Sequence, residues 1–449
     1  MVVEHSAHRK GHARRRGVAL LALTATAALA LSACSGGGAA SSADNGGDDE
    51  LTVWFPGSNP VEIELVTKSI VPAFEEETGV DVNVTYLDYS DLSTKLNAAF
   101  AGGTAPDVFG HGPAAVADFV INDRVEPLDD YVDKLSADDQ DDLAAALTGG
   151  QVDGVQYLMP LSLQGVLLVY SKADFAAAGL DPENPPTTWE EVHDAAEKLT
   201  VRDGAGTITR SGLLLPSQPV GRQQAFTTLL YSAGGSLISE DGTKSEFDSK
   251  AGIEALEYYV STYNGDDAVS SSLGANYIDS PTAQQPLALG TASITALSAQ
   301  AASQLQKTFP DKEFGVMTPP GFDGSDGYAV GGAGAGLMIN ADSAKKDLAW
   351  KFIQYMISPE TVTAYTEGIG TVPMRASAAE SSYVKSSPVI QAWLENSEQL
   401  RANPNVPGWV QVRDTIDKYL EQALNKTLSP AEALDQMSVA VDSILAQNK

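Results

Sequence analysis

The stretch Tyr157–Lys172 reads YLMPLSLQGVLLVYSK and limits the possible folds of this chain more than any other segment. Its run of valine and leucine, interrupted by Pro160 and Gly165, is typical of a strand buried on both faces. Gln164 brings two hydrogen-bond donors and an acceptor into this apolar run. The segments before and after it each read as a βα unit, so we expect it to cross between two lobes, with Gln164 facing the space between them. Taken alone, it fits an ordinary core strand at least as well.

The rest of the chain alternates between strand and helix patterns. At 449 residues it is too long for one hydrophobic core and should form at least two domains. Residues 51–55 predict a strand, and a helical pattern then runs from Val61 toward Gly79, with a kink expected at Pro72. A half-buried strand is expected at residues 80–85. This alternation predicts an α/β fold of mostly parallel sheets covered by helices on both faces.

The first 33 residues have the pattern of an export signal. A basic head precedes an apolar run at residues 18–31 that is too short to span a membrane comfortably. The sequence Leu-Ser-Ala-Cys that ends at Cys34 looks like a bacterial lipobox, in which the cysteine is lipidated; a plain signal peptide is the alternative. We therefore expect a lipoprotein signal peptide at residues 1–33 and a flexible tether at residues 34–50. The body would be anchored by Cys34 to the outer face of the cytoplasmic membrane.

Charge and composition exclude several classes of protein. Removal of residues 1–33 leaves 23 basic and 58 acidic residues, a net charge of −35. Such a surface repels nucleic acids and anionic lipids. Only His111 and His193 remain in the mature chain, so no metal site or cofactor is indicated. Phosphate-loop and nucleophile-elbow motifs are absent, and we expect no catalytic residues. A secreted carbohydrate-active enzyme stays open as the alternative, because glycosidase carboxylates need only converge in space.

Two short loops follow predicted strands and should border a ligand site. Ligands of open α/β sheets bind beyond the carboxyl ends of the strands, where the loops 56–59 and 110–113 are expected. Ser58, Asn59 and His111 offer polar partners for hydroxyl groups, and Trp409 could supply an apolar wall. Ser58 and Asn59 could equally serve as turn and helix-capping residues, and His111 as a satisfied loop histidine.

Several segments together resemble the family 1 extracellular solute-binding proteins of ABC importers, the maltose-binding-protein-like group. The resemblance covers residues 51–445 and rests on the following stretches: residues 51–59, 101–108, 160–172, 188–191, 233–235, 289–292, 331–332, 348–352 and 370–375. It implies a two-lobed, periplasmic-binding-protein-like (type II) fold with lobes joined by crossing strands. Lobe 1 would comprise residues 51–161 with 316–372, and lobe 2 residues 162–315 with 373–449.

The resemblance also implies a set of ligand-binding positions. In it, Ser58 and Asn59 match a polar pair that binds sugar hydroxyls, and Gln164 matches a hinge-side carboxylate. Trp409 matches an aromatic platform in lobe 2. The remaining positions are His111 and Gly112 in the loop after the third strand, Gly332 in a glycine pair, and Arg375. For Arg375, pairing with carboxylates is the alternative to contact with an anionic ligand.

The resemblance implies a binding protein that captures a carbohydrate between its lobes and delivers it to the transmembrane subunits of an ABC permease. Residues 296–298 and 331–336 lack aromatic side chains that many relatives carry there. A polyol, a sugar phosphate or another small polar solute is therefore the alternative. We expect a monomer, held to the membrane by its lipid anchor.

Overall fold

The computed structural model describes residues 50–448 except residues 279 and 323. The predicted signal peptide, Cys34 and nearly all of the predicted tether lie outside the described residues. The described residues belong to one unit, Gly46–Lys449, which contains two large sheets. Among these residues, no helix has both the length and the apolar character needed to cross a bilayer.

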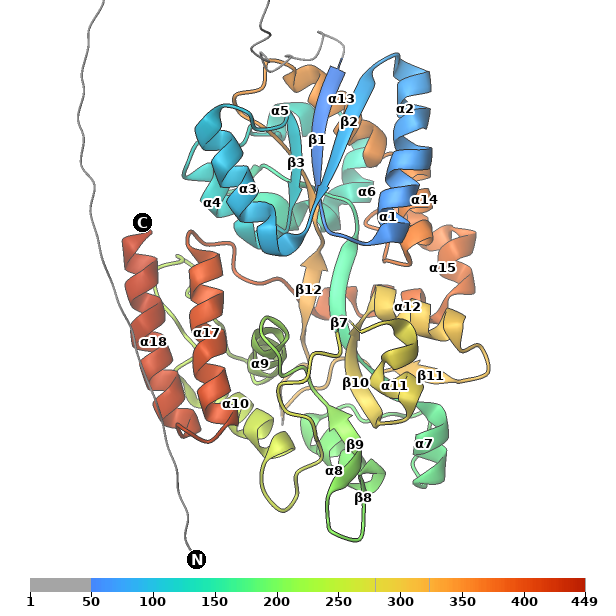
Figure 1. The fold of residues 1–449 in the computed structure, drawn as a ribbon, viewed down its shortest axis with the longest axis vertical. Coiled ribbons are helices and arrows are strands. Elements are labelled where there is room, and N and C mark those ends of the chain that lie inside the picture. Colours follow the sequence, from blue (N-terminus) through green and yellow to red (C-terminus); the bar gives the residue numbers. More distant parts are fainter. Residues whose placement is uncertain (1–49, 279, 323, 449) are drawn as a thin grey trace, which may run out of the picture. The chain divides into compact units, whose positions relative to one another are not determined.

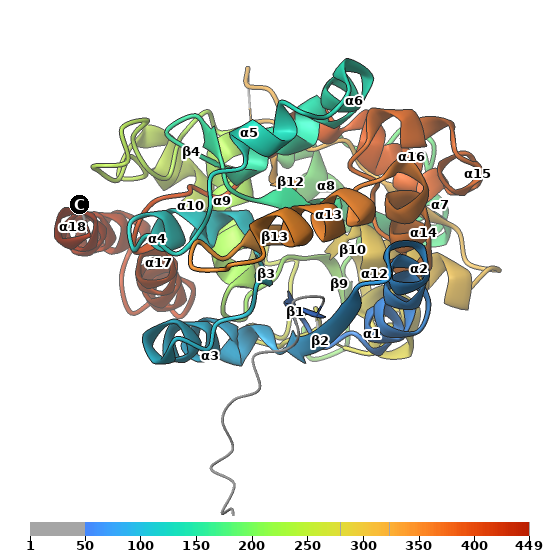
Figure 2. The same ribbon diagram turned by 90° about the horizontal axis from the view of Figure 1, so that it is seen from above.

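The first sheet is built around the N-terminal strand. Its strands, in spatial order, are β2 (Asp81–Leu87), β1 (Glu50–Pro56), β3 (Val108–His111), β13 (Gly336–Ile339) and β6 (Met159–Pro160). Side chains alternate across a strand, so Leu51, Val53 and Phe55 enter one core while Trp54 packs against another. The first core is closed by α1 (Pro60–Leu65), α2 (Val71–Thr78), α13 (Lys346–Met356) and α14 (Pro359–Ile369). The second is closed by α3 (Tyr89–Gly102) and α4 (Val116–Val120). Figure 2 shows α3 on one flank of these strands and α1, α2 and α14 on another.

The second sheet follows the same rule of alternation. Its strands are β14 (Leu400–Arg401), β12 (Ala329–Ala333), β7 (Leu163–Ser171), β10 (Ala292–Ser298), β9 (Ile208–Leu214) and β8 (Val201–Arg202), and β11 (Phe314–Val316) also pairs with β7. In β7, Leu168 and Tyr170 point into one core, and Leu167 and Val169 into the other. The first of these cores holds α8 (Trp189–Leu199), α9 (Gly221–Ser232), α10 (Lys250–Tyr263), α17 (Trp409–Leu424) and α18 (Pro430–Gln447). The other holds α12 (Ala299–Thr308), α15 (Ser382–Ser386) and α16 (Pro388–Glu395).

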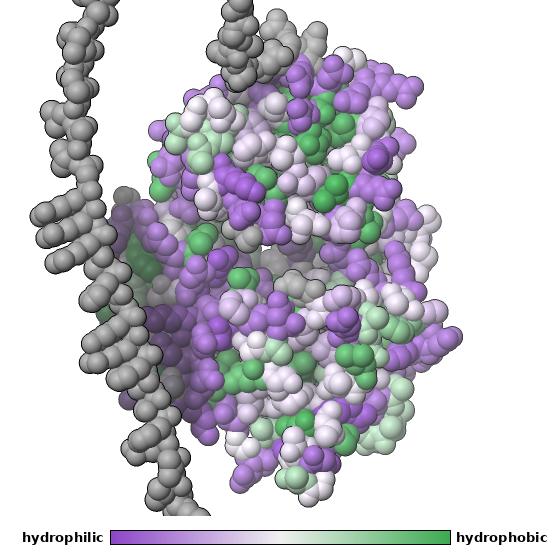
Figure 3. Space-filling view, viewed as in Figure 1, coloured by the Kyte–Doolittle hydropathy of each residue, from purple (hydrophilic) through white to green (hydrophobic). Residues whose placement is uncertain are grey.

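Smaller elements connect these layers. They are α5 (Asp129–Val132), α6 (Ala137–Leu147), α7 (Lys172–Ala177), α11 (Pro286–Leu289) and the hairpin of β4 (Gln151–Val152) with β5 (Val155–Gln156). Near the predicted kink, a π-helical stretch at Val66–Ile70 lies just before Pro72, which has no backbone N–H to donate. On the face shown in Figure 3, hydrophilic and neutral residues dominate and hydrophobic residues form small, scattered groups.

The predicted crossing at Tyr157–Lys172 is present. β6 pairs in the first sheet and β7 in the second, so the chain passes from one sheet to the other at residues 161–162. Figure 1 shows β7 beside β12 between the two bodies. Near the crossing, the Leu163 N–H donates to the Val372 carbonyl at 2.8 Å. The two-lobed α/β class is therefore confirmed.

Two details differ from the expectations. The sheets are mixed rather than mostly parallel, because the strands next to the crossings run against their neighbours: β13 is antiparallel to β3 and β6, and β7 to β10, β11 and β12. The glycine-rich segment at residues 328–340 forms two strands, β12 and β13, which belong to different sheets. β12 thus joins the second sheet, although residues 316–372 were expected in lobe 1.

Candidate functional site

A polar pocket lies where β1 ends and the chain crosses between the sheets. Its cavity volume is about 360 Å³, and its wall includes the predicted residues Ser58, Asn59 and Gln164. Most of the wall comes from the first sheet and its helices, and Gln300, on α12, extends it to the second sheet. The full lining is Phe55, Pro56, Gly57, Ser58, Asn59, Glu62, Tyr89, Leu161, Ser162, Gln164, Gln300, Ala335, Gly336, Leu337, Tyr365, Ile369 and Thr371. Larger grooves along α2 and α16 contain none of the predicted site residues.

The loop after β1 is shaped by Gly57. Its φ of 111° lies in a region that glycine adopts readily, and its N–H donates to the Leu87 carbonyl at 2.7 Å. This turn leads Ser58 and Asn59 into the pocket wall. Asn59 also caps the following helix, because its Oδ1 accepts from the Val61 N–H at 3.0 Å. The capping role considered from the sequence is therefore real, and it fixes the Asn59 side chain at the edge of the pocket.

Gln164 lies at the start of β7 with an exposed side chain. Within the described residues, the structure records no hydrogen bond to its side-chain amide. The amide is thus available to a solute. Gly332 does not line the pocket but pairs with Gln164 in the β12–β7 ladder, with a φ of 111°. Gly332 therefore supports the strand that carries the glutamine.

Glu62 and Tyr365 form a polar contact in the pocket that the sequence did not reveal. The Tyr365 hydroxyl donates to Glu62 Oε1 at 2.8 Å. Burial raises the pKa of the Glu62 carboxyl, and the hydrogen bond from Tyr365 partly offsets this effect. The two residues are 303 positions apart, so no local pattern could have linked them. Tyr89, at the start of α3, also lines the pocket and was likewise missed.

His111 and Gly112 are not part of the pocket lining. His111 Nδ1 accepts from the Gly112 N–H at 2.9 Å, and Nε2 lies 3.2 Å from Ser93 Oγ. Both ring nitrogens are therefore used within the protein, which matches the alternative of a satisfied loop histidine. The ring packs edge-on against the pocket residue Tyr89 at 6.3 Å between centroids. Burial lowers the pKa of His111 to about 4.

Trp409 and Arg375 were predicted to contact the ligand, but neither lines the pocket. Trp409 begins α17 and is only 4% exposed, because it packs in the core around α9 and α18. Its ring therefore offers no platform to a solute. The Arg375 guanidinium binds Asp139 at 2.7 Å and Asp142 at 2.9 Å. Carboxylate pairing, the alternative given for Arg375, is what the structure contains.

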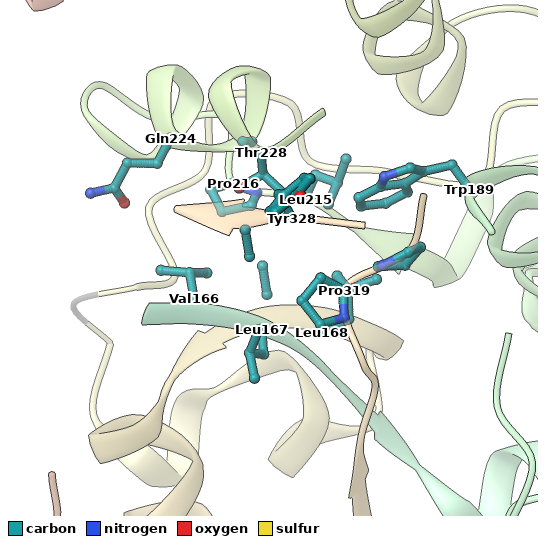
Figure 4. Close-up of a pocket in the computed structure, with 14 residues that line it drawn as sticks. Val166, Leu167, Leu168, Trp189, Leu215, Pro216, Gln224, Thr228, Pro319 and Tyr328 are labelled. Atoms are coloured by element: carbon teal, nitrogen blue, oxygen red, sulfur yellow. The ribbon is translucent and has the colours of Figure 1, made fainter. Parts of the chain in front are cut away.

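A second cavity lies along β7 in the second body and is mainly apolar. Its wall includes Val166, Leu168 and Trp189, with Gln224, Thr228 and Tyr328 among the polar residues that border it (Figure 4). Gln164 and Val166 share one face of β7, because side chains alternate along a strand. The apolar cavity thus continues the face of β7 that carries Gln164.

Two sheet-and-helix bodies, joined by crossing strands and sharing a polar pocket at the crossing, define a two-lobed solute-binding protein. Residues 59–363 match the family model of the bacterial extracellular solute-binding proteins, and the chain belongs to this family. It is a binding protein and not an enzyme.

Relatives and solved structures agree over most of the chain. The diacetylchitobiose binding protein DasA of Streptomyces coelicolor is 25% identical over 434 residues, which cover 94% of this chain and 96% of that protein. The structure of the cyclic alpha-maltosyl-1,6-maltose binding protein from Arthrobacter globiformis is similar with a TM-score of 0.74 and 26% identity, over 89% of this chain and 99% of that one. A solute-binding protein from Thermotoga lettingae, solved with alpha-D-tagatose, also has a TM-score of 0.74, with 25% identity over 88% of this chain and 100% of that one.

Proposed function

We propose that this protein captures a carbohydrate in the pocket at the β6–β7 crossing and delivers it to the transmembrane subunits of an ABC importer. The observation that carries the proposal is the side-chain amide of Gln164, which has no hydrogen-bond partner among the described residues and lines a pocket bordered by Ser58, Asn59 and Glu62. Neutral and acidic acceptors of this kind suit sugar hydroxyls. The relatives that bind diacetylchitobiose and cyclic alpha-maltosyl-1,6-maltose favour the same class of solute.

A thermal-shift screen tests the proposed solute class. Sugars, polyols and sugar phosphates are added singly to the purified protein, because a bound solute raises stability by RT ln(1 + [L]/Kd). We expect at least one sugar to raise the melting temperature of the wild type and to raise that of Gln164→Ala less. A polyol as the sole stabilising solute would shift the proposal to that class, and no shift with any compound would contradict it.

We further propose that the mature protein is a monomer anchored through lipidated Cys34 to the outer face of the cytoplasmic membrane. The lipobox-like sequence before Cys34 supports the anchor. Membrane fractionation of cells that express the wild type or Cys34→Ser tests it. The wild type should sediment with membranes and the variant should be released. Retention of the variant in the membrane fraction would contradict the anchor.

A further inference from the structure

The pocket has a one-sided charge distribution. Its seventeen lining residues include one carboxylate, that of Glu62, and no lysine, arginine or histidine. Glu62 lies in the first turn of α1, directly after the loop that carries Ser58 and Asn59. An anionic group that entered the pocket would therefore meet a negative charge with no cation beside it.

The Glu62 carboxylate is held in place but not saturated. Tyr365 donates to Oε1, and within the described residues no other hydrogen bond to this carboxylate is recorded. Oε2 can accept from a further donor, since an ionised carboxylate has about four acceptor positions. Poor solvation raises the pKa of Glu62, and this increases the benefit of a donor, above all a cationic one.

Within the part of the chain that the structure describes, two further hydroxyl groups at or beside the pocket lack hydrogen-bond partners. Thr371 lines the pocket, and its buried Oγ1 has no hydrogen-bond partner among the described residues. The ring of Tyr86 stacks on the ring of the pocket residue Phe55, with 5.2 Å between the ring centroids. The buried Tyr86 hydroxyl also has no hydrogen-bond partner among the described residues. Buried polar groups are normally satisfied, so unpaired hydroxyls beside a pocket indicate a position that a polar solute or water fills.

We propose that Glu62, oriented by Tyr365, selects the charge of the solute: it binds a hydroxyl or protonated amine of a neutral or amino sugar and excludes phosphorylated and carboxylated sugars. This inference rests on the proposed function and narrows its solute class. It removes sugar phosphates from the alternatives considered from the sequence. It also gives Glu62 a specificity role that is separate from the hydrogen bonds of Gln164.

Matched sets of probes test the inference by isothermal titration calorimetry. The sets are glucose with glucosamine and glucose 6-phosphate, trehalose with trehalose 6-phosphate, and N,N′-diacetylchitobiose with chitobiose, whose amines are free. We expect the wild type to bind a neutral or amine-bearing member of at least one set. Where that set contains a phosphorylated sugar, the phosphorylated sugar should bind at least tenfold more weakly than the neutral or amine-bearing member.

Variants of Glu62 separate its charge from its shape. Glu62→Gln keeps the volume and should weaken binding of an amine-bearing probe by about tenfold or more, since a charge-assisted hydrogen bond is lost. Binding of the matched neutral probe should weaken less. Glu62→Lys should improve the relative affinity for the phosphorylated probe. Glu64→Gln is the control, because Glu64 is exposed on the same helix and does not line the pocket.

The outcomes distinguish this inference from the proposed function. If a neutral sugar bound and its phosphate bound equally well, or if Glu62→Gln bound every probe like the wild type, the charge selection would be wrong while sugar binding stood. If no sugar in these sets or in the thermal-shift screen bound the wild type, the proposed function would fail and the inference with it. Circular dichroism of each variant identifies any loss of affinity that comes from misfolding.

Discussion

At the scale of single residues, the Gln164 side chain can be removed with little expected effect on the stability of the fold. It is exposed, and within residues 50–448 no hydrogen bond to its amide is recorded. Gln164→Ala should therefore leave the free energy of unfolding within about 0.5 kcal/mol of the wild type. Solute affinity should fall by about tenfold, as calorimetry can measure. Gln354→Ala, exposed on α13, is the matched control, and equal affinities of the two variants would contradict a direct contact.

His111 predicts a dependence of stability on pH. Its pKa of about 4 in the folded protein lies below its ordinary value of 6.5. The unfolded chain therefore binds more protons than the folded protein between these pH values. The free energy of unfolding should fall as pH is lowered from about 6.5 to 4, and this part of the fall should be absent in His111→Gln. Urea titrations of both proteins between pH 4 and 7.5 measure it, and parallel profiles would contradict the assignment.

Arg375 predicts a loss of stability without a loss of solute affinity. Arg375 is 4% exposed, and its guanidinium binds Asp139, Asp142 and the Ile357 carbonyl. Arg375→Ala leaves these groups without their partner and should cost about 3 kcal/mol in urea-induced unfolding. Lys385→Ala removes an exposed ion pair with Glu380 and should cost under about 1 kcal/mol. A large drop in sugar affinity in Arg375→Ala, with the fold intact, would restore the ligand-contact hypothesis.

At the scale of elements, the close approach of β12 to β7 positions the pocket. A Cβ at Gly331 would lie 2.6 Å from the Gln164 carbonyl oxygen and 2.8 Å from Gly165 Cα. Gly331→Ala should therefore separate the strands, lower the free energy of unfolding by about 1–3 kcal/mol and weaken solute binding. Gly204→Ala has open space around its Cβ and serves as the control. Wild-type stability of Gly331→Ala in urea titration would show that the ladder adapts.

The elements also show how far the sequence could predict the structure. The crossing at Tyr157–Lys172 was predictable because the segments before and after this apolar strand pattern each read as a βα unit. The division of β12 from β13 was not, because residues 328–340 form a continuous strand-like, glycine-rich segment and only partner choice separates the halves. Trp409 was predicted as a platform from the resemblance, and its burial depends on α9 and α18, which are distant in sequence.

Only part of the pocket could be predicted from the sequence. The loop after β1 could be placed from local turn chemistry, and it brings Ser58 and Asn59 to the wall. Glu62 could have been suspected, since it lies in the first turn of the helix that Asn59 caps. Its partner Tyr365 could not, because the contact requires α14 to pack beside α1 after most of the chain has been added. Long-range contacts of this kind carry no sequence signal of their own.

At the scale of the whole described chain, the two bodies also contact each other away from the crossing strands. Asn405 accepts from the Ala117 N–H at 2.9 Å and donates to the Gln151 carbonyl at 3.0 Å. The Gly408 N–H donates to Asp118 at 2.7 Å, so the loop before α17 is tied to α4. A solute that touches both bodies can shift the population of closed molecules.

Small-angle X-ray scattering measures this shift most directly. The wild type is compared without solute and with a saturating concentration of the sugar that gives the largest shift in the thermal screen. If the pocket at the crossing captures solute between the bodies, the radius of gyration should decrease on binding, and at the same sugar concentration Gln164→Ala should show a smaller decrease. An unchanged radius of gyration, with calorimetry showing the wild type fully bound, would contradict capture by closure.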